Sequence, residues 1–488
     1  MASLKRELFS GVFYTAIAKY SGILISLVVA GVLSRLIAPE EFGVITVATV
    51  VISFFSVFSD LGIAPAVVQQ QDLTDEDLSG LFSFSCWTGL ALGGLFFLSS
   101  WLIASFYEDQ ALVPIIQLLS LNLFFASANI IPNALLFKAK NFKFIAWRTL
   151  GIQVAGGVIA IAVALLGGGI YALVVNPILS SLLLFVVSYR KYPQKLKFSW
   201  GIVPLRKIFR FSAYQFLFNI ICFFSRNLDK LLIGKHLGMT LLGYYDKSYR
   251  LMMLPLQNIT YVITPVMHPV FSGLQNDKPK MIASYGKIVR FLALIGLPLS
   301  ATLWFTAKEI TLVIFGDQWL PSVPVFQILS LSVGIQIILS TSGAIFQAAN
   351  DTKNLFVTGL ISAVLNVTGM CIGIFYFKTL EAVAWGICIS FTLSFLQSYW
   401  VMYRVTFKQG MLQFWKQFVS PAALSVLIAG VLWSVSAWLD SSPRLISLIV
   451  KGMIALTVWV VYMQMSGEYD IWGKTRGMVA TLRNKLNR

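Results

Sequence analysis

Charged side chains lie inside stretches of this sequence that are otherwise apolar, and they are the residues with which the protein could do chemistry. Arg226, Asp229 and Lys230 are spaced i, i+3 and i+4, so in a helix they share one face. Asp229 can pair at full strength with only one of the two cations, which leaves the other free for phosphate, the anion that a guanidinium fork suits. The alternative is an ion cluster that only braces this helix against its neighbours.

Five further charges fall within apolar stretches: Lys19, Asp60, Asp246, Lys247 and Arg250. Each would cost at least about 2.5 kcal/mol at a helix centre if it faced lipid, so we expect them to face a cavity or a partner. Lys19 has no carboxylate within a helical turn, which favours a cavity role over snorkelling to the interface. We expect Asp246 and Arg250 to form a local pair, and Asp60 to be a gating or helix-end residue.

Cations outnumber acids in this set, which suits an anionic substrate. We predict that four cations bind it, namely Lys19, Arg226, Lys230 and Arg250, and that three acids are gating or structural charges, namely Asp60, Asp229 and Asp246. Aromatic side chains can stack on ring-shaped ligands such as sugars, and weak candidates for such contacts are Tyr14, Tyr214, Tyr244 and Tyr245. With two histidines and no phosphate-binding loop or nucleophile motif, we predict no catalytic residue, no metal site and no cofactor.

The elements that must position these residues are membrane helices. Apolar residues make up 57% of the chain and charged residues 12%, against about 25% charged in soluble domains. Taking about 20 apolar residues as one crossing, we predict an all-α integral membrane protein of about fourteen transmembrane helices. Their ranges are 11–37, 41–68, 79–105, 111–136, 142–166, 169–189, 206–234, 240–272, 285–315, 320–350, 354–377, 380–404, 416–438 and 444–465.

The distribution of the 37 lysines and arginines predicts the orientation. Most fall at one set of helix ends, including the segments 138–148, 190–210 and 404–416, so the positive-inside rule places both termini in the cytoplasm.

No aromatic-rich basic module accompanies the net charge of +17, which argues against nucleic acid as a partner. Lys19 interrupts the first apolar run, which favours an uncleaved first helix over a signal peptide.

The sequence also repeats. Val113-Pro-Ile-Ile-Gln-Leu-Leu-Ser-Leu121 recurs as Val323-Pro-Val-Phe-Gln-Ile-Leu-Ser-Leu331, and the Arg35/Gly43 spacing recurs as Lys235/Gly243. Both matches lie six helices apart, and six is even, so the copies enter the membrane from the same side. We therefore predict two six-helix bundles related by a pseudo-twofold axis along the membrane normal, with helices 13 and 14 outside the repeat.

Several motifs, in order, resemble the bacterial polysaccharide flippases of the colanic-acid and O-antigen exporter type: Pro39-Glu-Glu-Phe-Gly43, Ser59-Asp-Leu-Gly-Ile63, Gly168-Gly-Ile-Tyr-Ala-Leu-Val174, Asn227-Leu-Asp-Lys-Leu-Leu-Ile-Gly234, Leu242-Gly-Tyr-Tyr245 and Gly316-Asp-Gln-Trp319. The resemblance covers residues 1–410 and places the chain in the multidrug, oligosaccharidyl-lipid and polysaccharide exporter superfamily. It implies two six-helix bundles around a cavity, and flipping of a polyprenyl-diphosphate-linked oligosaccharide to the periplasmic leaflet of the bacterial inner membrane by alternating access. An ion gradient could drive the cycle.

This interpretation divides the chain into five parts: an N-terminal bundle (1–190), a basic cytoplasmic linker (191–205), a C-terminal bundle (206–405), two additional helices (406–466) and a basic amphipathic cytoplasmic tail (467–488). The expected partners are the lipid-linked oligosaccharide, membrane lipids, and a polysaccharide polymerase with its assembly proteins. The alternatives are a multidrug exporter of the same fold, which the basic surplus opposes, and a non-catalytic scaffold of a polysaccharide assembly complex. A membrane glycosyltransferase or polymerase is disfavoured because the outer loops are short.

Overall fold

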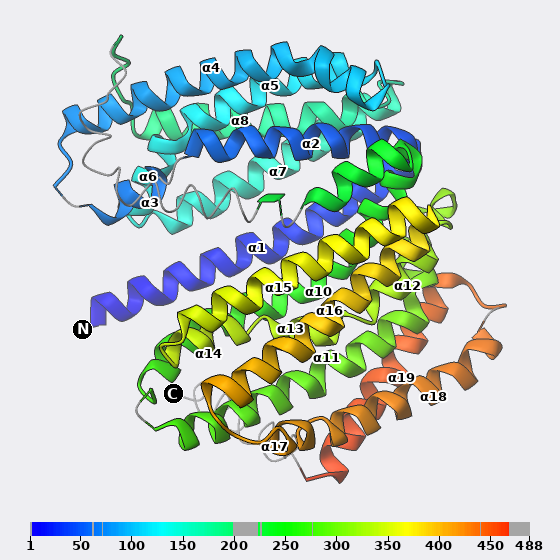
Figure 1. Ribbon diagram of the computed structural model, residues 1–488. Coiled ribbons are helices and arrows are strands. Elements are labelled where there is room, and N and C mark those ends of the chain that lie inside the picture. The colour runs from blue at the N-terminus through cyan, green and yellow to red at the C-terminus, as the bar shows by residue number, and fades with distance from the viewer. Residues whose placement is uncertain are drawn as a thin grey trace, which may run out of the picture. The chain divides into compact units, whose positions relative to one another are not determined.

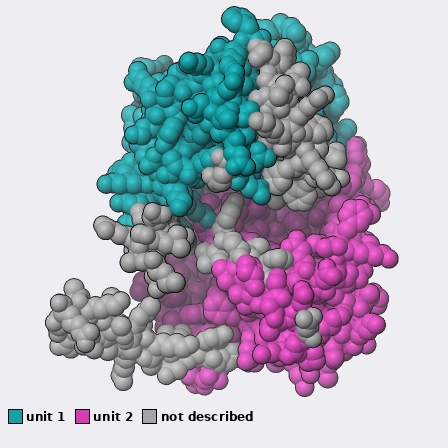
Figure 2. Space-filling view, turned by 90° about the vertical axis from the view of Figure 1, so that its left-hand side faces the viewer, with its two compact units in different colours: residues 1–246, 314–318 teal, residues 247–313, 319–488 magenta. Residues whose placement is uncertain are grey.

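The protein is helical throughout the part of the chain that its structure describes. A computed structural model describes residues 2–60, 63–70, 72–198, 223–224, 227–275, 277–439 and 441–467, and within these ranges it contains helices and no strands (Figure 1). Arg226 and Tyr214 lie outside the described residues, as do most of the predicted seventh helix and the predicted amphipathic tail. The chain divides into two compact units, one of residues 1–246 and 314–318 and the other of residues 247–313 and 319–488 (Figure 2).

The first unit holds the helices of the N-terminal half. Their bounds are α1 Ala2–Leu36, α2 Pro39–Asp60, α3 Ile63–Gln69, α4 Asp75–Tyr107, α5 Leu112–Ala128, α6 Ile130–Lys138, α7 Phe142–Leu165 and α8 Tyr171–Lys191. A further helix runs through residues 227–236. Helix α5 packs against α4, α8 and α2, while α7 packs against α1 and α8 (Figure 1). The chain passes into the second unit within α10 (Met239–Ser272) and returns briefly at the end of α11 (Lys278–Phe315).

The second unit is built on α10 and α11 and the helices that follow. These are η1 Asp317–Trp319, α12 Ser322–Ser330, α13 Val333–Leu339, α14 Ser342–Ala348, α15 Thr352–Cys371, η2 Ile372–Phe377, α16 Leu380–Val401, η3 Met402–Thr406, α17 Leu412–Lys416, α18 Val419–Leu439 and α19 Arg444–Met465. Helices α15 and α16 pair along their length, and α18 pairs with α19 (Figure 1). An apolar cluster from α11, α18 and α19 holds the last two helices on the unit through Leu294, Leu424, Ile428 and Leu432.

Local sequence sets the helix ends. Thr74 caps α4 by accepting a hydrogen bond from the backbone N–H of Asp77, whose carboxylate accepts one from the N–H of Thr74. Asp351 caps α15 through the backbone N–H of Asn354. Helices α15 and α16 each continue into a π-helical turn, η2 and η3, a geometry that accommodates one extra residue per turn.

Element boundaries repeat with the period that the sequence motif predicts. Helix α5 begins at Leu112 and α12 at Ser322, and α6 ends at Lys138 while α14 ends at Ala348; in both pairs the residue numbers differ by 210. The turn that follows is also the same, with left-handed residues at Lys140 (φ 53°) and Asn350 (φ 57°). The internal repeat is therefore confirmed at the level of the fold.

The predicted spans match helices, although several are broken. Among the described residues, eleven helices are long and apolar enough to cross a membrane, or up to twelve if the bent pair 322–330 and 333–348 is counted as one span. The bend of 43° falls where Gly334 packs directly on Gly296 of α11, a contact that leaves no room for a side chain at either glycine. The protein is thus a multi-pass membrane protein, and the total of fourteen helices stays a prediction.

Candidate functional site

The predicted cluster of helices 7 and 8 forms two separate polar pairs in the first unit. Lys230 Nζ lies 2.8 Å from Asp246 Oδ1, and both side chains are largely buried. The hydroxyl of Tyr245, which is fully buried, donates a 2.6 Å hydrogen bond to Asp229 Oδ2. Asp229 thus accepts a hydrogen bond from a tyrosine, while Lys230, one of the two cations that the sequence offered as its partner, forms its ion pair with Asp246. Its other oxygen is buried with no hydrogen-bond partner among the described residues.

The remaining predicted site residues are spread along α1, α2 and α10. Lys19 and Tyr14 are half-buried on α1, Tyr244 is half-buried on α10, and Arg250 is exposed on α10. Asp60 ends α2, and its side chain lies outside what the structure describes. Lys19 lies one helical turn before Gly22, whose Cα packs on the side chain of Gln153 from α7. The assignment of these residues to a substrate site stays a prediction.

Two helix starts from the two repeats cross at a pair of glycines within the first unit. A Cβ atom on Gly43 would overlap the carbonyl oxygen of Met239, and one on Gly243 would overlap that of Pro39. The contact is reciprocal, because positions 39 and 43 of α2 correspond to positions 239 and 243 of α10 at the offset of 200 seen in the sequence. Such a self-matching contact has the form of an isologous interface, so a local twofold axis relates these two helix starts.

Polar contacts flank this crossing in the same reciprocal manner. At the end of α4, Glu108 pairs with Lys235 at 2.7 Å, and the Tyr107 hydroxyl donates to the carbonyl of Leu231. At the corresponding end of α11, Gln318 Nε2 donates to the carbonyls of Ser34 and Ile37 at the end of α1. We call these contacts, together with the glycine crossing, the reciprocal clasp. The ion pair with Lys235 lowers the pKa of Glu108.

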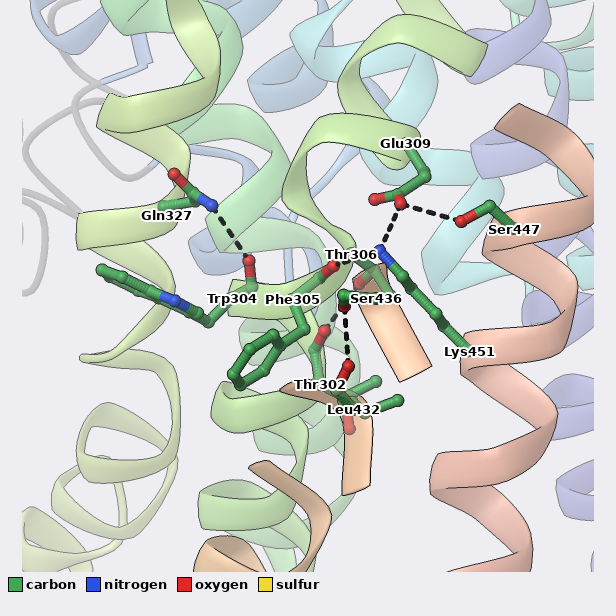
Figure 3. A network of polar contacts seen from close by, with 10 residues as sticks. All are labelled: Thr302, Trp304, Phe305, Thr306, Glu309, Gln327, Leu432, Ser436, Ser447 and Lys451. Atoms are coloured by element: carbon green, nitrogen blue, oxygen red, sulfur yellow. Dashed lines mark hydrogen bonds and ion pairs between the residues drawn. The ribbon is translucent and has the colours of Figure 1, made fainter. Parts of the chain in front are cut away.

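The second unit contains a buried ion pair that was not predicted from the sequence. Lys451 of α19 lies 2.5 Å from Glu309 Oε1 of α11, and the Ser447 hydroxyl donates to the same oxygen at 2.9 Å (Figure 3). Lys451 also donates to the carbonyl of Phe305, one turn earlier on α11. Both charges fall inside predicted spans, so a scan of every span for charged residues would have found them.

Comparisons with known proteins agree with this architecture. A sequence profile of the family described as "Polysaccharide biosynthesis protein" matches residues 32–324, more than half of the chain. The chain belongs to this family. Membership confirms, at the family level, the resemblance drawn from the motifs.

Several characterised relatives align over most of their length. The teichuronic acid biosynthesis protein TuaB of Bacillus subtilis (strain 168) is 25% identical, with 88% of this chain and 90% of that protein covered. The lipopolysaccharide biosynthesis protein WzxC of Escherichia coli (strain K12) is 26% identical over the same shares. The succinoglycan biosynthesis transport protein ExoT of Rhizobium meliloti (strain 1021) is 26% identical, covering 80% of this chain and 79% of that protein.

Solved structures show the same fold. The lipid II flippase MurJ in an inward closed conformation is similar with a TM-score of 0.70 at 15% identity, covering 93% of this chain and 98% of that chain. An inward-facing multidrug resistance MATE family transporter of the MOP superfamily is similar with a TM-score of 0.59 at 16% identity, covering 85% and 98%. The predicted fold class, an all-α membrane protein, is therefore confirmed.

Proposed function

We propose that this protein flips a polyprenyl-diphosphate-linked oligosaccharide from the cytoplasmic to the periplasmic leaflet of the bacterial inner membrane. The observation that carries the proposal is the fold: a lipid II flippase matches 93% of the chain with a TM-score of 0.70. The family adds that relatives aligned over most of this chain are named for polysaccharide biosynthesis and, in one case, transport. One finding names a lipid substrate and the other names polysaccharides, so we infer a lipid-linked sugar as the substrate class.

The chemistry of such a substrate explains why buried cations are needed. Its diphosphate and sugar hydroxyls would lose their water in hydrocarbon, so a carrier must offer a hydrated path and compensating positive charge. We assign this role to Lys19 and Arg226, with Lys230 and Arg250 as further candidates. In this conformation Lys230 is paired with Asp246, so it would reach an anion only after that pair separates.

Alternating access would require the reciprocal clasp to open. In the proposed orientation, with both termini in the cytoplasm, α1 reaches the periplasmic side at its Leu36 end, and the clasp would lie there. The Gly43 and Gly243 crossing brings two backbones into direct contact, which leaves no passage between these two helix starts. Release of a substrate on that side would thus need the helix starts to move apart. An ion gradient is the proposed energy source, and a polymerase with its assembly proteins is the proposed recipient of the glycan.

The substrate role is tested by replacing cations in cells that depend on this protein for glycan export. We expect Lys19→Ala and Arg226→Ala to abolish export while the protein stays folded in the membrane. Lys353→Ala, at an exposed position in the first turn of α15, is the matched control and should export normally. Lys19→Arg should be tolerated better than Arg226→Lys, because an ammonium cannot reproduce a planar guanidinium fork. Export at the parental rate by Arg226→Ala would remove the seventh helix from the substrate path.

A multidrug exporter is the second candidate, since a multidrug transporter shares the fold. Organic cations would favour an acidic path, whereas lysine and arginine outnumber acidic residues in the predicted spans. Cells that express the protein should therefore show no gain in resistance to lipophilic cations. Resistance that requires Asp229 or Asp246, with glycan export unaffected by loss of the protein, would favour the multidrug function instead.

A further inference from the structure

Arg148 is a cation of the first unit that the structure turns inward. It lies on α7, and its guanidinium donates to Ser188 Oγ of α8 at 2.5 Å and to Asn133 Oδ1 of α6 at 2.9 Å. Its position in the segment 138–148 predicts a charge at a cytoplasmic helix end. In fact it bridges three helices, six residues after the start of α7, instead of extending along the helix toward the interface.

The charge of Arg148 is not neutralised by the residues around it. Both hydrogen-bond partners are neutral, and the structure places no carboxylate of the described residues within ion-pair distance of the guanidinium. Arg148 is half-buried, with its Nε atom fully buried. A charge withdrawn from water with only neutral partners is unfavourable, and proteins compensate such charges with a counter-ion, a metal or a bound ligand. Two other cations of the described residues do have a carboxylate partner: Lys230 pairs with Asp246, and the buried Lys451 pairs with Glu309.

Two buried polar atoms of these helices lack partners among the described residues. One is Nε of Arg148 itself, and the other is Oδ1 of Asn129, which occupies the N-cap position of α6 one turn before Asn133. Buried polar atoms in native structures almost always have partners, which can be a ligand or ordered water. An asparagine amide can also rotate to present its NH2 group. The guanidinium edge and the amides can together offer several N–H donors to one group of oxygens.

We infer that Arg148, with Asn133 and Asn129, forms a binding site for a phosphate or diphosphate group at the α6–α7–α8 junction. A guanidinium suits this ligand because its forked N–H groups match the spacing of phosphate oxygens. The adjoining chain carries Lys140 and Lys143, both exposed, which would raise the local concentration of anions. The diphosphate of the proposed substrate and the phosphate of an anionic lipid share this chemistry. The first source rests on the proposed function, and the second does not.

A purely structural role for Arg148 makes a different prediction, and Asn133→Asp separates the two. This substitution keeps the guanidinium and an oxygen that accepts its hydrogen bond, but the new carboxylate neutralises the charge of Arg148 with a group of the protein itself. If Arg148 only braces three helices, Asn133→Asp should strengthen the brace and leave anion binding unchanged. If Arg148 binds phosphate, the new carboxylate should occupy the fork and repel the ligand, while the protein stays folded.

The test is calorimetric titration of the full chain, in a detergent with neutral headgroups and at fixed ionic strength, with inorganic pyrophosphate. We expect saturable binding by the parental protein, weakened roughly tenfold or more in Asn133→Asp and Arg148→Gln. Lys143→Gln removes an exposed cation of the same helix and should change the Kd much less. The Kd of Arg148→Lys should lie between those of the parental protein and Arg148→Gln, because lysine keeps the charge but lacks the forked N–H groups of the guanidinium. No saturable binding by the parental protein, or parental binding by folded Asn133→Asp, would overturn the inference.

Competition then identifies the source of the phosphate. Displacement of pyrophosphate by polyprenyl diphosphate assigns the site to the substrate, and displacement by phosphatidylglycerol in nanodiscs assigns it to a lipid headgroup. These measurements involve no sugar and no transport. Pyrophosphate binding that depends on Arg148, in a protein that does not flip the lipid-linked glycan, would uphold this site and reject the proposed function. Flipping of the lipid-linked glycan by a protein whose pyrophosphate binding does not depend on Arg148 would uphold the proposed function and reject this site.

Discussion

The buried ion pair of α11 and α19 allows a prediction about what holds the last two helices in place. The exposed fractions of Glu309 and Lys451 are 7% and 3%, so neither charge can be hydrated if its partner is removed. Lys451→Met would leave Glu309 as an uncompensated buried charge, one of whose oxygens already lacks a hydrogen-bond partner among the described residues. We expect a loss of about 3 to 5 kcal/mol in the free energy of unfolding.

Removing both charges should cost far less. In Glu309→Leu/Lys451→Met the desolvation penalty of both ions disappears, and replacement of a buried pair by apolar side chains is often neutral or stabilising by about 1 to 4 kcal/mol. The double variant should therefore be more stable than either single variant, with a coupling energy of roughly 3 kcal/mol or more. Trp459→Phe is the matched control at the same helix pair, since it removes one neutral hydrogen bond to the Leu294 carbonyl and should cost about 1 kcal/mol.

The assay is reversible denaturation by sodium dodecyl sulfate in mixed micelles, followed by tryptophan fluorescence and by accessibility of a cysteine placed on α19. The accessibility readout distinguishes release of α18 and α19 from unfolding of the whole chain. If the double variant loses the sum of the two single losses, the charges act independently and the anchoring role assigned to the pair is refuted.

Three further predictions concern the clasp and a helix cap. Gly43→Ala should cost about 1 to 3 kcal/mol of stability by overpacking against α10, whereas Gly94→Ala, where a Cβ meets nothing, should be neutral or stabilising in the same thermal assay. The ion pair with Lys235 lowers the pKa of Glu108, so the stabilisation that this pair gives the folded protein is present above the unfolded pKa of about 4.3 and is lost as pH falls through the lower folded pKa. The difference in melting temperature between the parental protein and Glu108→Gln should therefore vanish in acid. A difference that grew in acid would contradict this. Asp351→Ala should destabilise α15 by about 1 kcal/mol, measured as faster amide exchange in its first turn, and unchanged exchange there would show that the cap is dispensable.

Asp351 also illustrates how a loop carboxylate can be held ionised. Burial acts to raise its pKa, but hydrogen bonds from Thr406 and Asn354 and the charge of Lys278 more than offset this, so the net shift is downward. The Thr406 hydroxyl donates at 2.6 Å, and Lys278 itself donates to the carbonyl of Thr406. This cap therefore ties the start of α15 to the end of η3 and the start of α11, and its contribution should persist until pH falls below the usual carboxylate range.

Hydropathy predicted most helices, because burial in lipid requires long apolar segments whatever they pack against. The predicted span 444–465 coincides with α19, and 142–166 ends one residue beyond α7. The breaks were not predicted: 320–350 is three helices, and its bend depends on a contact between Gly334 and Gly296. Such contacts join residues far apart in sequence, so a single span carries no signal for them.

The candidate site was predictable in composition but not in pairing. In-span charge identified Lys230 and Asp246, yet their ion pair and the Tyr245 bond to Asp229 depend on how two helices meet. Arg148 was overlooked for a different reason. It lies close enough to a helix end to count as an interfacial charge, and only its bonds to Asn133 and Ser188 show that it points inward.

Reconstitution measures whether the protein moves a lipid-linked glycan between leaflets. The purified full chain is incorporated into liposomes with a fluorescent polyprenyl-diphosphate oligosaccharide, and a membrane-impermeant quencher reports the fraction in the outer leaflet over time. We expect the protein to accelerate exchange between leaflets, and we expect Lys19→Ala or Arg226→Ala to remove the acceleration while Lys353→Ala retains it. Exchange no faster than in protein-free liposomes, with the protein shown to be folded and an imposed ion gradient present, would refute the proposed flippase function.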